Sequence, residues 1–230
     1  MKTSLRTLLL CSLLLPAALF AAPFEGKVSL KMSSDGKAHD IRYNIKGDKL
    51  RIDMPAASGG KSMGGMIVDL GKKETTMLMD EQKMYMTMAM PDNTAPKASG
   101  KNEDVKLEKT SQTEKILGYL ATKYLATSKD STTEMWLAEG IGMFTSLSGS
   151  NPMGGRKAAA PQGWESSLAG KELFPLRVVT KNKGGKETFR MEATAVDKQS
   201  LPDTLFAPPA DYQKLDMSGM MKGLLPGTSR

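Results

Sequence analysis

The chain has 230 residues, with 32 Lys and Arg against 25 Asp and Glu, a formal net charge of +7, one histidine and one cysteine. A single cysteine excludes an internal disulfide or a cysteine-based zinc site, and a single histidine excludes a His cluster for metal or relay chemistry. With 40% hydrophobic and 25% charged residues, the composition is that of a globular protein. Aromatic residues make up only 6%, and basic residues are interspersed with acidic ones, so we expect no nucleic-acid partner.

The first 21 residues predict a cleaved signal peptide. Lys2 and Arg6 precede an apolar run over residues 8–22 that ends in small residues, which is the pattern of secretory signals. A spanning helix needs about 20 apolar residues, so a permanent membrane anchor is disfavoured. We therefore expect an exported protein, periplasmic or alternatively secreted, with a single domain over residues 22–216 and a flexible tail over 217–230.

The mature chain opens with three predicted strands. Residues 24–32, 41–46 and 50–54 alternate between apolar and polar side chains, and this period of two is typical of a half-buried strand. The turn-forming sequences Ser-Ser-Asp-Gly at 33–36 and Gly-Asp at 47–48 separate the three segments. Successive strands with short connections predict an antiparallel meander.

The same pattern continues through three further strands. Residues 66–70, 75–79 and 83–90 are apolar-rich segments joined by short polar turns. Residues 91–104 have almost no apolar content and predict a flexible loop.

Residues 113–126 fit either a helical face or a strand. Gly118 disfavours a helix interior, and a turn-like Ser-Lys-Asp-Ser sequence follows at 128–131. We therefore favour a hairpin made of residues 120–127 and 132–138.

The remaining sequence predicts little helix. Residues 141–170 are rich in Gly, Ala and Ser and predict one or two short helices. Strands at 176–180 and 187–196 flank a Lys-Gly-Gly-Lys turn, and a Pro-rich segment at 200–212 closes the domain. The total of about ten strands and two short helical pieces predicts an all-β or α+β fold.

Five stretches, taken in order, resemble a known family of exported bacterial proteins. They are Phe24-Glu25-Gly26-Lys27-Val28, Ile45-Lys46-Gly47-Asp48-Lys49-Leu50-Arg51-Ile52, Ile116-Leu117-Gly118-Tyr119 with Lys123-Tyr124, Glu134-Met135-Trp136-Leu137, and Leu201-Pro202-Asp203-Thr204-Leu205-Phe206-Ala207-Pro208-Pro209 with Tyr212. The family is domain of unknown function 4412, which is similar in fold to periplasmic lipoprotein carriers and outer-membrane lipoprotein receptors. The resemblance implies a curved antiparallel half-barrel with short helices covering its concave face. It suggests a hydrophobic-ligand role and transfers no catalytic residue.

Methionine is the unusual side chain of this sequence, with 18 copies. Four alternate in one predicted strand over residues 84–90, and Met77 and Met79 lie in the strand before it. Three interpretations stay open: a packed core, an adaptable cavity for an acyl chain, lipid or lipidated peptide, and a copper(I) site on the 84–90 strand. Residues two apart on one strand are about 6.6–6.8 Å apart at the backbone, so the side chains would have to lean together, and this geometry disfavours the copper site.

No other pattern indicates chemistry. His39 follows a turn beside Asp40 and is expected to be a solvated surface side chain, and no Walker or Gly-x-Ser-x-Gly motif is present. We therefore predict a non-enzymatic protein without a cofactor, whose partner is a lipid or lipidated protein and whose basic residues allow peripheral membrane contact. The oligomeric state stays open. The predicted cavity residues are Val28, Leu30, Ile41, Tyr43, Ile45, Met77, Met79, Met84, Met86, Met88 and Trp136.

Overall fold

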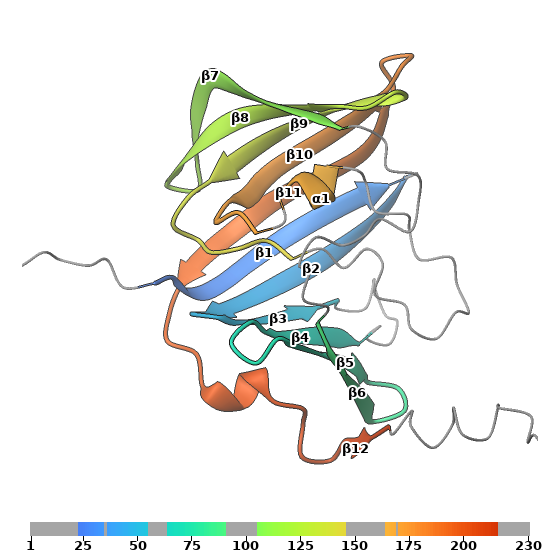
Figure 1. Cartoon of the computed structure of the whole chain (residues 1–230), viewed down its shortest axis with the longest axis vertical. Helices are drawn as coiled ribbons and strands as arrows, with labels where there is room; N and C mark the ends of the chain where they lie inside the picture. The colour runs from blue at the N-terminus through green and yellow to red at the C-terminus, as the bar shows by residue number, and fades with distance from the viewer. Residues whose placement is uncertain are drawn as a thin grey trace, which may run out of the picture.

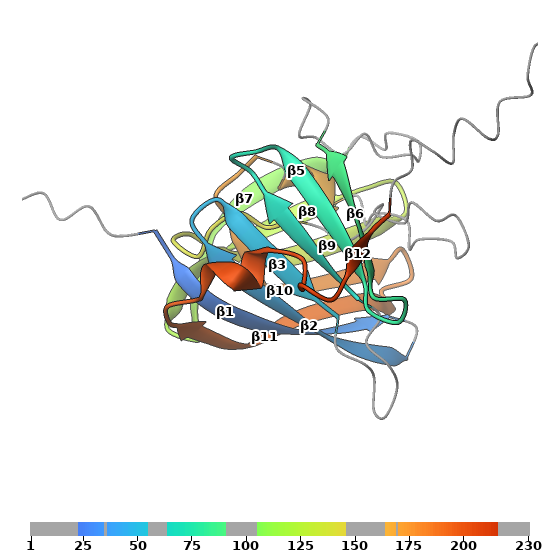
Figure 2. The ribbon, with the colours of Figure 1, turned by 90° about the horizontal axis from the view of Figure 1, so that it is seen from below.

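In the computed structural model, residues 23–34, 36–54, 64–90, 105–145, 164–168 and 170–215 are described. They form one open, strongly curved sheet of twelve strands (Figures 1 and 2). The strands in chain order are β1 (Glu25–Ser34), β2 (Lys37–Lys46), β3 (Lys49–Asp53), β4 (Gly65–Asp69), β5 (Glu74–Met79), β6 (Met84–Ala89), β7 (Lys106–Ile116), β8 (Tyr119–Thr127), β9 (Ser131–Ala138), β10 (Phe174–Asn182), β11 (Glu187–Lys198) and β12 (Gln213–Lys214).

The sheet consists of two meanders that meet along one seam. Its strand order is β12-β6-β5-β4-β3-β2-β1-β11-β10-β9-β8-β7. Strands β1–β6 are joined one to the next, as are β7–β11, and β1 pairs antiparallel with β11 between the two sets. Every pairing is antiparallel except that of β12, which runs parallel to the edge strand β6. The predicted antiparallel sheet is therefore confirmed.

The ten predicted strands all form, and two strands were not predicted. Strand β7 has the sequence KLEKTSQTEKI, in which only Leu107 and Ile116 are apolar. It lies at the free edge of the sheet, where a strand needs no continuous apolar face. Strand β12 is only two residues long and gives no periodic signal.

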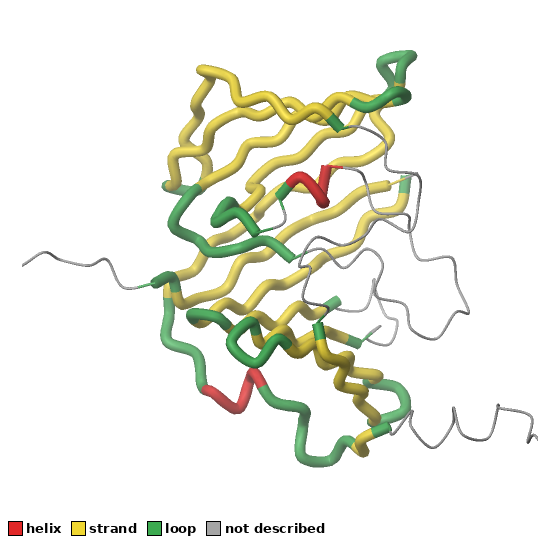
Figure 3. Tube along the Cα trace, in the orientation of Figure 1, coloured by secondary structure: helices red, strands yellow, loops and turns green. Residues whose placement is uncertain are grey.

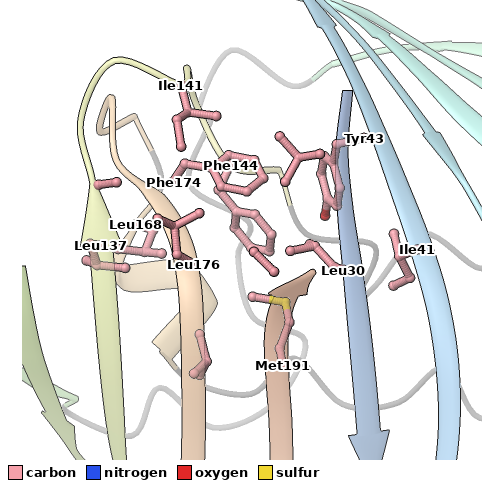
Figure 4. Packing of buried hydrophobic residues seen from close by; sticks show 14 of the residues in the cluster. Leu30, Ile41, Tyr43, Leu137, Ile141, Phe144, Leu168, Phe174, Leu176 and Met191 are labelled. Atoms are coloured by element: carbon pink, nitrogen blue, oxygen red, sulfur yellow. The ribbon is translucent and has the colours of Figure 1, made fainter. Parts of the chain in front are cut away.

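The register shows which side chains share the face that packs the core, here called the core face. Val28, Tyr43, Ile52 and Met66 are successive cross-strand partners from β1 to β4, and each is at most 3% exposed. Strand alternation places the neighbouring polar residues on the opposite, outer face. The buried cluster on the core face continues across β9–β11 through residues such as Leu137, Leu176 and Met191 (Figure 4).

The expected helical cover is wrong in extent. Among the described residues, one α-helix of four residues, α1 (Trp164–Ser167), lies over the core face together with the extended segment 141–145 (Figures 1 and 3). The segment 141–170 is rich in Gly and Ser, which favour turns and loops over helix. Ile141, Phe144, Trp164 and Leu168 cover the core face with side chains, each at most 8% exposed.

The C-terminal segment covers part of the outer face of the first meander. It contains the 3₁₀-helix η1 (Asp203–Phe206) and ends in β12. Lys46 Nζ donates to the carbonyl of Leu201 at 2.7 Å, and Arg51 donates to the carbonyl of Leu205 at 3.1 Å. Farther along, the Tyr212 hydroxyl donates to Asp80 at 2.8 Å. These bonds hold the predicted closing segment against β2–β6.

Some predictions concern residues outside the described part of the chain. They are the signal peptide at 1–21, the loop at 91–104 and the tail at 217–230. Among the described residues there is no helix with the length and apolarity that crossing a bilayer requires.

Candidate functional site

The methionines of β5 and β6 form two directly opposed pairs. Met77 is the register partner of Met86, and Met79 is the partner of Met84. Met66 on β4 is in turn the partner of Met77. The register between β2 and β6 has no bulge, so these side chains lie on the core face, in line with Tyr43 and Ile52. We call Met77, Met79, Met84, Met86 and Met88 the methionine patch.

Burial distinguishes the patch from the centre of the core face. Met86 is 4% exposed, but Met77, Met79, Met84 and Met88 are only half-buried. By contrast, Ile52 and Val28 on the same face are completely buried. The core face therefore changes from a closed core to a partly accessible apolar surface between β4 and β6.

Five other predicted cavity residues lie beneath the chain's own cover. Val28, Leu30, Ile41, Tyr43 and Ile45 are all buried members of the core cluster.

Aromatic rings from the cover and from the start of β10 fill the space above these residues. The Phe144 ring centroid lies 5.7 Å from that of Tyr43 and 5.7 Å from that of Trp164. Phe174 stands edge-on to Tyr43 at 5.5 Å. Ring pairs at these separations attract each other beyond their burial of apolar area.

A hydrogen bond joins the sheet to the cover. The Tyr43 hydroxyl donates to the carbonyl of Thr145 at 2.9 Å. Burial raises the pKa of Tyr43 above its usual value, and the nearby carboxylate of Glu165 raises it further. Tyr43 therefore stays a neutral donor throughout the physiological range.

Trp136 lies on the other side of the sheet. Its partner on β10 is Arg177, and its partner on β8 is Lys123, whose ammonium lies 5.9 Å from the centre of the indole. The three face outward because Met135, the residue before Trp136 on β9, is completely buried on the core face. The prediction that Trp136 lines the same surface as Val28 and Tyr43 is therefore wrong, because Trp136 lies on the outer face of β9.

Trp136 instead lines a shallow groove of about 410 Å³ on the outer face of β9–β11. The charged residues that line it are paired with each other: Lys181 contacts Glu134 at 4.0 Å, Arg177 contacts Glu192 at 3.3 Å, and Arg190 contacts Glu187 at 2.7 Å. The hydrogen bond from Lys123 lowers the pKa of Glu134 most strongly, against the opposing effect of burial. With acids and bases compensating each other, the groove has no excess charge to attract an ionic ligand.

The described residues contain no group of three or more His, Cys, Asp or Glu side chains that could hold a metal ion. Methionine thioethers are a different class of ligand and are not included among these side chains.

Phe144 is a core-face residue that sequence reasoning missed. It lies, like Trp164, in a Gly- and Ser-rich segment without periodicity, so only its apolar character could have indicated burial. Trp164 is 2% exposed, and its indole Nε1 has no hydrogen-bond partner in the described part of the chain. An unpaired buried donor costs free energy, so Trp164 stabilises the cover less than the burial of its ring alone would.

Comparisons with solved structures concern the fold. An uncharacterized conserved protein from Thermus thermophilus is 12% identical, with coverage of 85% of this chain and 91% of that one and a TM-score of 0.50. PNGF-II is 17% identical over 86% of this chain and 32% of its own, with a TM-score of 0.49. A domain from Vibrio parahaemolyticus, provisionally named an outer membrane lipoprotein-sorting protein domain, is 6% identical over 80% of this chain and 89% of its own, with a TM-score of 0.34.

At the level of sequence, no curated protein matches the chain. A family match does exist and covers residues 24–212, almost the entire described sheet. It agrees with the resemblance that the five sequence stretches predicted. The chain is therefore a member of the family described as Domain of unknown function (DUF4412).

Proposed function

We propose that this protein is an exported, non-enzymatic binding protein that holds an apolar ligand against the methionine patch. The ligand would be an acyl chain, a lipid or a lipidated peptide. The observation that carries the proposal is the change in burial along the core face, where completely buried side chains on β1–β3 give way to half-buried methionines on β5 and β6.

Methionine suits such a surface. Its unbranched side chain has three rotatable bonds and a polarizable sulfur, so it adapts to ligands of variable shape. Partly accessible apolar side chains that lie next to each other also favour contact with an apolar ligand. Each Å² of apolar surface removed from water contributes about 25 cal/mol to the binding free energy.

Export and domain limits belong to the same proposal. Residues 1–21 would be removed as a signal peptide on entry to the periplasm, residues 22–216 would be the binding domain, and 217–230 a flexible tail. Lipid or a lipidated protein would be the partner, with peripheral membrane contact through surface Lys and Arg.

A matched pair of charge insertions tests the site. Met88 lies on the core face opposite Thr75, and Ala89 follows it on the outer face opposite Glu74. Binding of a fluorescent fatty acid to the mature protein would be titrated for wild type, Met88→Lys and Ala89→Lys. A lysine ammonium on the core face would lose its hydration when the ligand binds over it, which costs free energy. We therefore expect Met88→Lys to weaken binding by roughly tenfold or more. Ala89→Lys should leave binding unchanged.

Two results would contradict the proposal. Wild type that shows no affinity for the fatty acid, and no lipid on organic extraction of protein purified from a native-like host, would instead favour an envelope protein with a solid core. Equal losses in the two variants would place the ligand elsewhere on the sheet.

A further inference from the structure

We infer that Met77, Met79, Met84 and Met86 form a binding site for a soft monovalent metal ion, copper(I), for which silver(I) is a redox-inert probe. This inference does not rest on the proposed apolar ligand. It rests on the way in which the register of β5 and β6 groups four thioethers.

The cross-strand register supplies what one strand cannot. Met84 and Met86 alone are two residues apart on one strand, a separation of about 6.6–6.8 Å. Directly opposed residues on antiparallel strands have Cβ atoms only about 4.5–5.5 Å apart. The pairs Met77–Met86 and Met79–Met84 therefore bring thioethers together from two strands, and the flexible side chains have the reach to converge over the sheet.

The burial of the four side chains suits an ion that must enter and then be sheltered. Met86 is 4% exposed and forms the inner part of the site. Met77, Met79 and Met84 are half-buried and give access from solvent. Met66, the partner of Met77 and 3% exposed, places a fifth sulfur in the same row.

The chemistry of the donors selects the ion. Thioethers are soft, neutral ligands that favour copper(I), whereas Mg²⁺ and Ca²⁺ require oxygen ligands. The described residues also provide no cluster of three His, Cys, Asp or Glu side chains that would attract a harder cation. A site made only of methionine sulfur is therefore specific for a soft ion.

A thioether has no proton to release, which distinguishes this site from others. Thiol and imidazole ligands must lose a proton before they bind, so their metal affinity falls as the pH falls. We expect the copper(I) affinity of the methionine site to be the same at pH 5.5 and pH 7.5. A pH-dependent affinity would assign the ion to another kind of donor, such as His39, and would overturn the inference.

The main experiment titrates the mature protein with silver(I) by native mass spectrometry and with copper(I) against a chromogenic chelator under reducing conditions. The test variant replaces all four methionines by leucine, which keeps the apolar volume and removes the sulfur. The control is the double variant Met135→Leu, Met191→Leu, which alters two buried methionines on β9 and β11, in the other meander. We expect one bound ion for wild type and the control, and at least a hundredfold weaker binding for the test variant.

Unchanged stoichiometry and affinity in the folded test variant would overturn the inference, because other methionines would then hold the ion. If the quadruple variant does not fold, the doubles Met77→Leu, Met86→Leu and Met79→Leu, Met84→Leu replace it, and each must weaken binding by itself. Fatty-acid binding measured on the same variants separates the two proposals. Leucine preserves an apolar surface, so the test variant can lose metal binding and still bind the fatty acid. Conversely, a wild-type protein that binds the metal ion but no fatty acid would contradict only the proposed function.

Discussion

The guanidinium of Arg177 on β10 forms two hydrogen bonds, of 2.9 and 3.1 Å, with the carboxylate of Glu114 on β7. Two strands, β9 and β8, lie between them in the sheet. Arg177 also contacts Glu192 on β11. One side chain thus links the free edge of the sheet to the strand beside the seam, across the strongly twisted outer face.

We expect Arg177→Ala to loosen the edge strand more than it lowers global stability. Ion pairs with solvent access contribute little to stability, so the melting temperature should fall by less than about 4 °C. Hydrogen exchange of the β7 amides should increase severalfold. Arg190→Ala removes the local Arg190–Glu187 pair on the same face and is the control. Equal exchange rates in β7 for the two variants would contradict the proposed link.

The same pair predicts an acid dependence. The pKa of Glu114 is lowered from its ordinary value of 4.5. The main cause is the hydrogen bond from Arg177, and burial acts in the opposite direction. A lowered carboxylate pKa gives stability that is complete above pH 4.5 and is lost as the pH falls through the folded-state value. The difference in melting temperature between wild type and Arg177→Ala should therefore be complete at pH 7 and shrink below pH 4.5. A difference that grows in acid would rule out this assignment.

Tyr43→Phe removes the hydroxyl that holds the cover. The carbonyl of Thr145 loses its donor, so we expect a cost of about 1–3 kcal/mol in unfolding free energy at pH 7. Burial raises the folded-state pKa of Tyr43 above 10.0, so its contribution is complete below pH 10 and is lost as the pH rises beyond it. The urea midpoints of wild type and Tyr43→Phe should differ equally at pH 7 and pH 9 and approach each other at pH 11. Curves that stay parallel up to pH 11 would contradict the burial of this hydroxyl.

Leu117→Asn should stabilise the protein. Leu117 and Gly118 connect β7 to β8 with φ values of 48° and 89°, as in a type I′ turn, where Asn-Gly is preferred. Leucine is strained in this left-handed region, and Leu117 is 44% exposed, so its apolar contacts contribute little. We expect a gain of about 0.5–1 kcal/mol, or roughly 2–4 °C in melting temperature. Leu120→Asn, at a 68% exposed strand position nearby, should give no gain.

The cover allows a comparison of two aromatic substitutions. Phe144→Ala removes a ring that contacts Tyr43, Trp164 and Phe174, and should cost about 3–5 kcal/mol. Trp164→Phe loses ring volume but also removes an unpaired buried N–H, so we expect a cost of about 1 kcal/mol or less. Denaturant unfolding of both variants checks this order. Equal costs would mean that the indole N–H is satisfied in solution.

The sequence was most informative where alternation was strong. Apolar core-face residues recur at alternate positions through most of the first six strands, such as Val28 and Leu30 on β1, and the limits of these strands were predicted within a few residues. It failed at β7, because an edge strand between solvent and β8 needs few apolar residues.

Two other features depend on tertiary context. The burial of Phe144 and Trp164 follows from contacts with strands distant in the sequence. Local residue propensities cannot predict such contacts. The parity of Trp136 was also not determined by β9 alone, because Met135, Trp136 and Leu137 are all apolar. The methionine pairs could be placed only when the register between β5 and β6 was known.

The seam between β1 and β11 joins residues that are more than 150 positions apart, as in the pair Val28–Val196. Each meander can grow from hairpins of neighbouring strands, but the seam must wait until almost the entire domain has been synthesised. Until then, β1 remains an open edge at which another chain could add a strand. Because contacts of long sequence separation slow folding, we expect seam closure to limit the refolding rate. The same delay would leave the nascent chain dependent on protection from aggregation longer than its many local hairpins suggest.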